Sequence, residues 1–189
     1  MKTIPELIHE SIDTKKKLLD SPEILTLIGE IAESAISVLR NGGKLIFAGN
    51  GGSFADALHL SAEFISRFKK DRAPLASIAL GCNNSAVTAI GNDYDYSDSL
   101  VRELQALGQK KDLFIAISTS GNSKNILKCI DEAKKIGMTV YGWTGNKKGK
   151  ISEMTRCLEI PSAETARIQE CHIMVGHILC EMIDNTLFS

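Results

Sequence analysis

The stretch Lys44-Leu45-Ile46-Phe47-Ala48-Gly49-Asn50-Gly51-Gly52-Ser53 decides the fold of this chain. Its apolar first half is typical of a buried strand, and its glycines allow a sharp turn into a following helix. A helix that begins at such a turn presents free backbone N–H groups and a partial positive charge, which bind anions. The same plan recurs where the apolar run 113–117 precedes the hydroxyl-rich run 118–123. Two such loops predict a site for a phosphorylated polyol, with one loop for the phosphate and one for the sugar.

Strand-like and helix-like segments alternate along the rest of the chain. Two helices are expected within 3–40, because prolines follow Thr3 and Ser21 and isoleucines recur at helical spacing. Beyond them we expect strands over 44–48, 76–80, 112–117, 138–143 and 156–160, and helices over 53–68, 85–90, 97–107, 123–136 and 164–187. This alternation predicts an α/β fold with a parallel sheet covered on both faces and a ligand site at the ends of the strands.

The last of these helices is apolar nearly all round over 171–180, apart from its histidines. Such a helix is buried on more than one side. Because the chain is small, we expect another subunit to supply part of that burial.

Length and charge limit the classes of protein to consider. The 189 residues suit a single domain spanning 1–189. The net charge of −1 provides no field that would draw the chain onto nucleic acid or an anionic membrane, so neither is expected as a partner. A short basic cluster is interpreted as a solvated helix end; it comprises Arg67, Lys69, Lys70 and Arg72.

Five scattered cysteines lack the CxxC spacing of a disulfide framework or a cysteine zinc site. They fit a reducing compartment. The charged N-terminal segment 1–19 does not resemble a signal peptide, and no apolar run approaches membrane-spanning length. The sequence therefore predicts a soluble, cytoplasmic protein.

Both loops hold more polar groups than a simple turn needs. The first is no dinucleotide fingerprint, because Phe54 stands where a third glycine is required, and no P-loop motif occurs either. Three glycines with Asn50 and Ser53 favour ligand binding over a tight turn alone. In the second loop one hydroxyl would be enough to cap the helix, yet there are four, which favours phosphate binding.

Two helices carry further candidate residues. His59 and Glu63 are four residues apart and share a helix face, so they can bind a divalent metal or form an acid–base pair. A surface pair is the simpler interpretation of this spacing alone. The final helix carries Gln169, His172 and His177, and its spacing leaves open which histidine would serve a site.

Four segments together resemble the sugar isomerase (SIS) domain family, most of all its heptose-phosphate isomerases; they are 49–64, 89–96, 117–123 and 166–179. The resemblance implies a three-layer sandwich with a five-stranded parallel sheet in flavodoxin-like order. It also implies a homotetramer with sites at subunit interfaces, and we place the N-terminal helices 3–40 at such an interface. One position departs from the pattern, because some relatives carry an aspartate where this chain has Ala166.

The resemblance also implies the residues of the site. Glu63 would be the base at carbon and His177 its partner acid or base, so that His177 is preferred over His172. The expected ligands of one zinc ion are His59, Glu63, Gln169 and His177. The expected substrate contacts, of which Ser118 to Ser123 hold the phosphate, are Asn50, Gly51, Gly52, Ser53, Glu63, Asn92, Asp93, Ser118, Thr119, Ser120, Ser123 and Gln169.

The activity that the resemblance implies is an aldose–ketose isomerisation. It would convert sedoheptulose 7-phosphate into D-glycero-D-manno-heptose 7-phosphate through an enediolate, as the first step of heptose supply for bacterial surface glycans such as lipopolysaccharide. Two alternatives without catalysis remain. One is a tetramer that binds the replication initiator protein, and the other is a sensor of sugar phosphates; bound zinc favours the enzyme over both.

Overall fold

The computed structural model describes residues 2–188, in which five strands form one fully parallel sheet. The strands lie in the order β2-β1-β3-β4-β5, which is the flavodoxin-like order of a doubly wound fold. Their bounds are β1 Leu45–Ala48, β2 Ser77–Ala79, β3 Leu113–Ile117, β4 Thr139–Gly145 and β5 Arg156–Ile160. The predicted fold class is confirmed.

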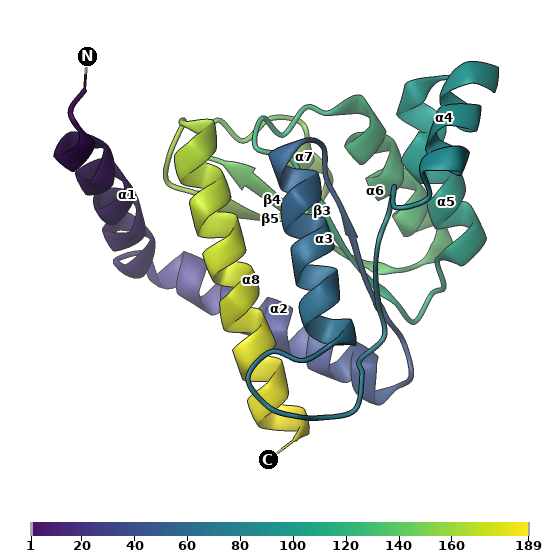
Figure 1. Cartoon of the computed structure of the whole chain (residues 1–189), viewed down its shortest axis with the longest axis horizontal. Coiled ribbons are helices and arrows are strands. Elements are labelled where there is room, and N and C mark those ends of the chain that lie inside the picture. The colour runs from purple at the N-terminus through teal and green to yellow at the C-terminus, as the bar shows by residue number, and fades with distance from the viewer. Residues whose placement is uncertain (1, 189) are drawn as a thin grey trace.

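Helices cover both faces of the sheet, which explains why every residue of β1 and β3 is buried. One face packs against α2 (Pro22–Arg40), α3 (Gly52–Ile65) and α8 (Thr165–Leu187), and α1 (Ile4–Leu19) packs on α2 and α8. The other packs against α5 (Ser99–Leu107), α6 (Lys124–Ile136) and α7 (Ile151–Met154). Helix α4 (Asn84–Asp93) buries no residue completely and lies beside α5 (Figure 1). Helices α3 and α8 run side by side across the front of the sheet (Figure 1).

Most element boundaries lie one or two residues from the predicted ones, and α4 extends to Asp93 instead of 90. Three differences have a clear reason. Helix α3 ends at Ile65 instead of 68, because Ser66 leaves the helical region with a ψ of −100°. The segment predicted as one helix over 97–107 begins with a separate 3₁₀ turn, Tyr96–Asp98, before α5. Helix α7 was not predicted, since its four residues are too few to show a periodic pattern.

One residue of the basic cluster is misassigned by the sequence. Arg67 and Lys69 are exposed as expected, but the side chain of Arg72 is only 1% exposed and pairs with Asp184. The prediction of a wholly solvated cluster is therefore wrong at Arg72, because the chain after α3 turns back toward α8.

All five cysteines are free thiols, as their spacing predicts. Burial raises the pKa of the Cys180 thiol to about 12 and that of Cys157 to about 12. No helix within residues 2–188 is both long and apolar enough to cross a membrane.

Candidate active site

The glycine loop after β1 is shaped by close approaches of the backbone. Gly51 has a φ of +55°, which favours glycine, and a Cβ at Gly49 would collide with the backbone of Ser53. A Cβ at Gly52 would lie 2.5 Å from Nε2 of Gln169, so the amide of Gln169 lies directly over the first turn of α3. Part of the glycine content thus has a structural cause, while Gly52 leaves room for a candidate site residue.

A pair of asparagines joins the two loops. The Asn50 amide donates to Oδ1 of Asn125 at 2.9 Å, and the Asn125 amide donates to Oδ1 of Asn50 at 2.8 Å. Asn125 is buried at the start of α6, so it holds the Asn50 side chain in a defined orientation. Sequence reasoning missed Asn125, whose only signal was its position in the first turn after the serine loop.

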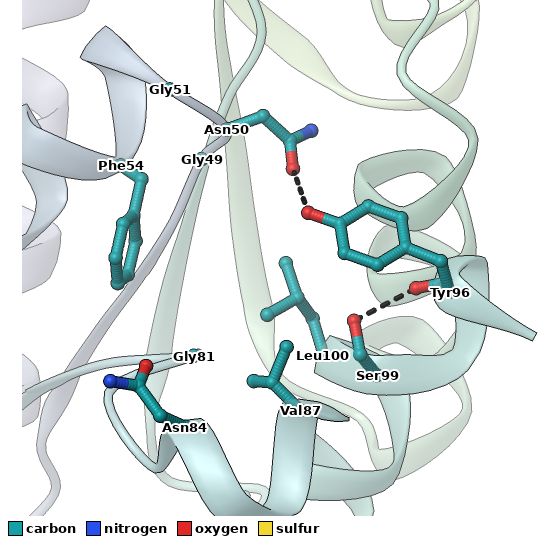
Figure 2. A pocket seen from close by; sticks show the side chains of 10 residues that line it. All are labelled: Gly49, Asn50, Gly51, Phe54, Gly81, Asn84, Val87, Tyr96, Ser99 and Leu100. Atoms are coloured by element: carbon teal, nitrogen blue, oxygen red, sulfur yellow. Dashed lines mark hydrogen bonds between the residues drawn. The ribbon is translucent and has the colours of Figure 1, made fainter. Parts of the chain in front are cut away.

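A cavity of about 160 Å³ opens beside Asn50, between the glycine loop and the α4–α5 segment (Figure 2). The Tyr96 hydroxyl donates to Oδ1 of Asn50 at 3.5 Å, and Phe54 forms the opposite wall (Figure 2). Neither residue was singled out from the sequence. The predicted contacts Asn92 and Asp93 are exposed at the end of α4, and neither lines this cavity.

The serine loop after β3 gathers hydroxyls at the N-terminus of α6. Ser118 is buried, and its Oγ lies 3.0 Å from Oγ of Ser123 and 3.5 Å from Oγ of Ser120. Gly121, with a φ of +66°, approaches the backbone of Lys148 too closely for any Cβ. Hydroxyl donors that converge at a helix N-terminus form a cradle suited to a phosphate group.

A cluster of three metal-ligating side chains spans α3 and α8. Nε2 of His59 lies 3.0 Å from Nε2 of His177 and 3.2 Å from Oε1 of Glu63. One ligand atom from each of these residues lies within 4.8 Å of the other two. His59 is exposed, and Glu63 and His177 are half-buried, so the cluster is accessible to a ligand.

This donor set fits zinc. Two imidazole nitrogens and a carboxylate oxygen are typical zinc ligands, and donors around one tetrahedral ion lie about 3.3 Å apart. The observed separations of 3.0 and 3.2 Å match that spacing. Gln169 lies eight residues before His177 on α8, about 12 Å along the axis, with its amide against Gly52.

The two histidines of α8 have different surroundings in the structure. His172 is fully buried, with Nε2 at 3.4 Å from the carbonyl oxygen of Thr144 and its ring 5.6 Å from that of Trp143. Burial lowers the pKa of His172 to about 4, so its imidazole is neutral in the core. His177, not His172, is the one that lies beside His59 and Glu63.

Asp56 is a further acidic group near this cluster that sequence reasoning missed. It precedes His59 by three residues on α3 and is half-buried, with Oδ2 lacking a partner among the described residues. Burial raises the pKa of Asp56 to about 6, against a smaller opposing effect of His59. The only sequence signal was the recurrence of polar residues at 56, 59 and 63 along one helix face.

Known proteins share both the sequence and this fold. Residues 12–145 match the SIS domain family. The phosphoheptose isomerase of Aneurinibacillus thermoaerophilus is 48% identical over 96% of this chain and 92% of its own length. The solved phosphoheptose isomerases of Francisella tularensis and Neisseria gonorrhoeae superpose with TM-scores of 0.91 and 0.89, at 35% and 37% identity. Each alignment covers 96% of this chain, and 96% and 97% of the respective relatives.

The chain therefore belongs to the SIS domain family of sugar isomerases. A phosphoheptose isomerase that is 48% identical over nearly the whole chain assigns it to a narrower group within that family. Within the family it is a member of the phosphoheptose isomerases, as the sequence resemblance predicts.

Proposed function

We propose that this protein converts sedoheptulose 7-phosphate into D-glycero-D-manno-heptose 7-phosphate. The observation that carries the proposal is the convergence of His59, Glu63 and His177 on one point between α3 and α8. A carboxylate and two imidazoles supply both the proton-transfer groups and the metal ligands that an aldose–ketose isomerisation needs. Neither non-catalytic alternative, replication-initiator binding or sugar-phosphate sensing, requires such a cluster.

In the proposed reaction, Ser118, Ser120 and Ser123 hold the phosphate while Asn50 and the glycine loop contact the sugar. Glu63 removes a proton from C1 of the ketose and returns it to C2. His177 moves a proton between O1 and O2, so that the enediolate between these steps collapses to the aldose. The number of protons is conserved, because each group takes up one proton and gives it back.

The proposal includes one zinc ion held by His59, Glu63, Gln169 and His177. Bound there, zinc would polarise the carbonyl and stabilise negative charge on the enediolate oxygens. A carboxylate cannot serve at once as a tight ligand and as a free base, so Glu63 would have to loosen its hold on the ion in order to act as the base. The triad supports three of the ligands, and Gln169 is included on the family resemblance.

The expected setting follows from the same assignment. We propose that the enzyme acts in the cytoplasm and provides heptose phosphate for surface glycans such as lipopolysaccharide. Its free thiols suit that reducing compartment. It acts as a homotetramer, with its catalytic sites built from more than one chain.

The test compares the zinc-loaded wild type with Glu63→Gln, using sedoheptulose 7-phosphate and measuring aldose formation. An amide cannot accept the proton from carbon, so turnover should fall by at least roughly a hundredfold while the fold is retained. Near-normal turnover of a folded Glu63→Gln protein would remove Glu63 from the mechanism. A wild type that produces no aldose would refute the proposed function.

A matched pair of variants tests the metal ligands. His177→Ala should lose zinc and activity together, because it removes a ligand from the cluster. His172→Ala should retain zinc, since His172 lies in the core against Thr144. Metal content after dialysis decides the matter, and the reverse pattern would refute the ligand set.

A further inference from the structure

Arg72 is a buried cation that makes no contact with the proposed substrate loops. It belongs to the segment after α3, which passes the C-terminal end of α8 before it returns to β2 (Figure 1). Its side chain is 1% exposed, and its guanidinium donates four hydrogen bonds. Nε donates to Oδ1 of Asp184 at 2.8 Å, and one terminal nitrogen donates to the Glu63 carbonyl at 2.9 Å. The other terminal nitrogen donates to the carbonyls of Phe64 and Ala73, at 2.7 and 3.2 Å.

Two of these acceptors belong to the last turn of α3. A helix leaves its final four carbonyls without partners inside the helix, and α3 ends at Ile65. Arg72 therefore provides partners for the carbonyls of Glu63 and Phe64, and it places a positive charge at the end where the helix dipole favours one. The backbone of Glu63 is thus held by a buried guanidinium and does not fray as an open helix end would.

The hydrogen bond from Nε of Arg72 to Asp184 joins this turn to α8. Asp184 lies seven residues after His177, which is about two turns and 10.5 Å along α8 on nearly the same face. Its side chain is only 2% exposed. Arg72 consequently links the helix that carries His59 and Glu63 to the helix that carries His177. In a site excluded from water, such a bond is strong and geometrically specific.

We propose that Arg72, anchored by Asp184, is a positioning residue that sets Glu63 against His177 in the metal and proton-transfer cluster. The inference rests on the proposed function of that cluster. Arg72 acts through the Glu63 main chain and not on the substrate. Supports of this kind around metal ligands are worth roughly tenfold to a hundredfold in metal affinity or activity.

The decisive protein is the double variant Arg72→Met with Asp184→Leu. It removes both charges of the pair together. A single substitution at a buried ion pair would instead leave one buried charge without its partner. We expect its zinc affinity, measured by competition with a chromogenic chelator, to fall roughly tenfold to a hundredfold. We expect kcat to fall by a similar factor and KM to change little, because the phosphate loop lies on other elements.

A matched control disrupts another ion pair with a buried carboxylate, at the amino ends of the central strands β1 and β3. Nζ of Lys44 lies 2.6 Å from Oδ2 of Asp112, which is fully buried at the start of β3. The backbone N–H of Lys44 donates to Oδ1 of Asp112, and that of Gln109 donates to Oδ2. Lys44→Met with Asp112→Asn removes the charge pair and keeps an oxygen for one of these two donors. This control should lower the melting temperature and leave zinc affinity and kcat at wild-type values.

The possible results separate the two proposals. A wild type that neither binds zinc nor isomerises the sugar refutes the proposed function. An active wild type alongside a double variant of unchanged zinc affinity and kcat, altered only in melting temperature, overturns the role of Arg72. If the double variant does not fold, Arg72→Lys decides. Lysine keeps the charge but lacks the planar guanidinium group whose nitrogens donate to both helices. Wild-type zinc affinity in that protein would therefore overturn the inference.

Discussion

At the scale of the residue, His172 and His177 show how surroundings decide the chemistry of a side chain. Both stand on α8, five residues apart. His172 faces the sheet at β4, where its buried imidazole donates to the Thr144 carbonyl. His177 faces α3, where two other ligating groups meet it. The first residue therefore affects stability, and the second is available for binding and proton transfer.

The depressed pKa of His172 predicts a pH dependence of stability. In the unfolded chain this residue takes up a proton near its ordinary pKa of about 6.5, whereas in the folded state it stays neutral until about pH 4. The unfolded state binds more protons in this window, so stability falls as the pH drops through it. Through His172 alone, the free energy of unfolding should fall by about 2 kcal/mol between pH 7 and pH 5.

The measurement is urea unfolding of metal-free wild type and His172→Gln at these two pH values and at one protein concentration. The variant should lose less stability on acidification than the wild type. The raised pKa of Asp56 acts in the opposite direction, but it is present in both proteins and cancels in the comparison. Equal pH dependence in the two proteins would contradict a neutral buried His172.

At the scale of the element, the serine loop combines a helix N-terminus with converging hydroxyls. Ser118 is fixed in the core at the end of β3, while Ser120 is exposed at the tip of the loop. Ser120 is thus the hydroxyl that can be removed with the least disturbance to packing. It provides a test of the loop and not of the core beneath it.

Ser120→Ala should raise the KM for sedoheptulose 7-phosphate about tenfold. A hydrogen bond to a charged group contributes about 1.5–3 kcal/mol, and 1.4 kcal/mol corresponds to a factor of ten in affinity. Steady-state kinetics measures the change, and binding of unphosphorylated sedoheptulose serves as the control. Equal losses for both sugars would place the phosphate elsewhere.

At the scale of the whole molecule, an apolar groove runs between α1, α2 and α8. Large apolar side chains are exposed there, including Leu19 at 66%, Leu25 at 43% and Met182 at 38%. The groove has a volume of about 470 Å³ and is lined almost wholly by such residues. Contiguous apolar surface of this kind marks an interface, which supports the proposed tetramer and the role of helices 3–40 in it.

Light scattering should therefore give a mass of about 82 kDa, four copies of the 20.5 kDa chain. Leu25→Glu places a charge in the groove and should dissociate the assembly. Leu107→Glu is the matched control, because Leu107 is similarly exposed, at 40%, but lies on α5 over the other face of the sheet. An active wild-type monomer would contradict both the tetramer and a catalytic site shared between chains.

The sequence by itself determined the class of fold and the positions of the glycine loop and the serine loop at the ends of β1 and β3. Apolar runs followed by glycine or serine loops specify buried parallel strands that feed helices, since both signals are local in the chain. The same local signals located the starts of α3 and α6 and the glycine and hydroxyl residues around them. They could not set the end of α3, because the group that caps it, Arg72, comes from beyond the helix.

Only the tertiary structure decided which distant residues meet. Periodicity shows the face of a helix on which a side chain lies, but not the element that covers that face. From the sequence alone, His59 and Glu63 are interpreted as a simple surface pair, but in the fold α8 brings His177 to 3.0 Å from His59. Arg72 is expected to be solvated, but in the fold it pairs with Asp184. Asn50 and Asn125 were joined in the same way. These contacts span 75 to 118 residues, a separation over which local pattern carries no information.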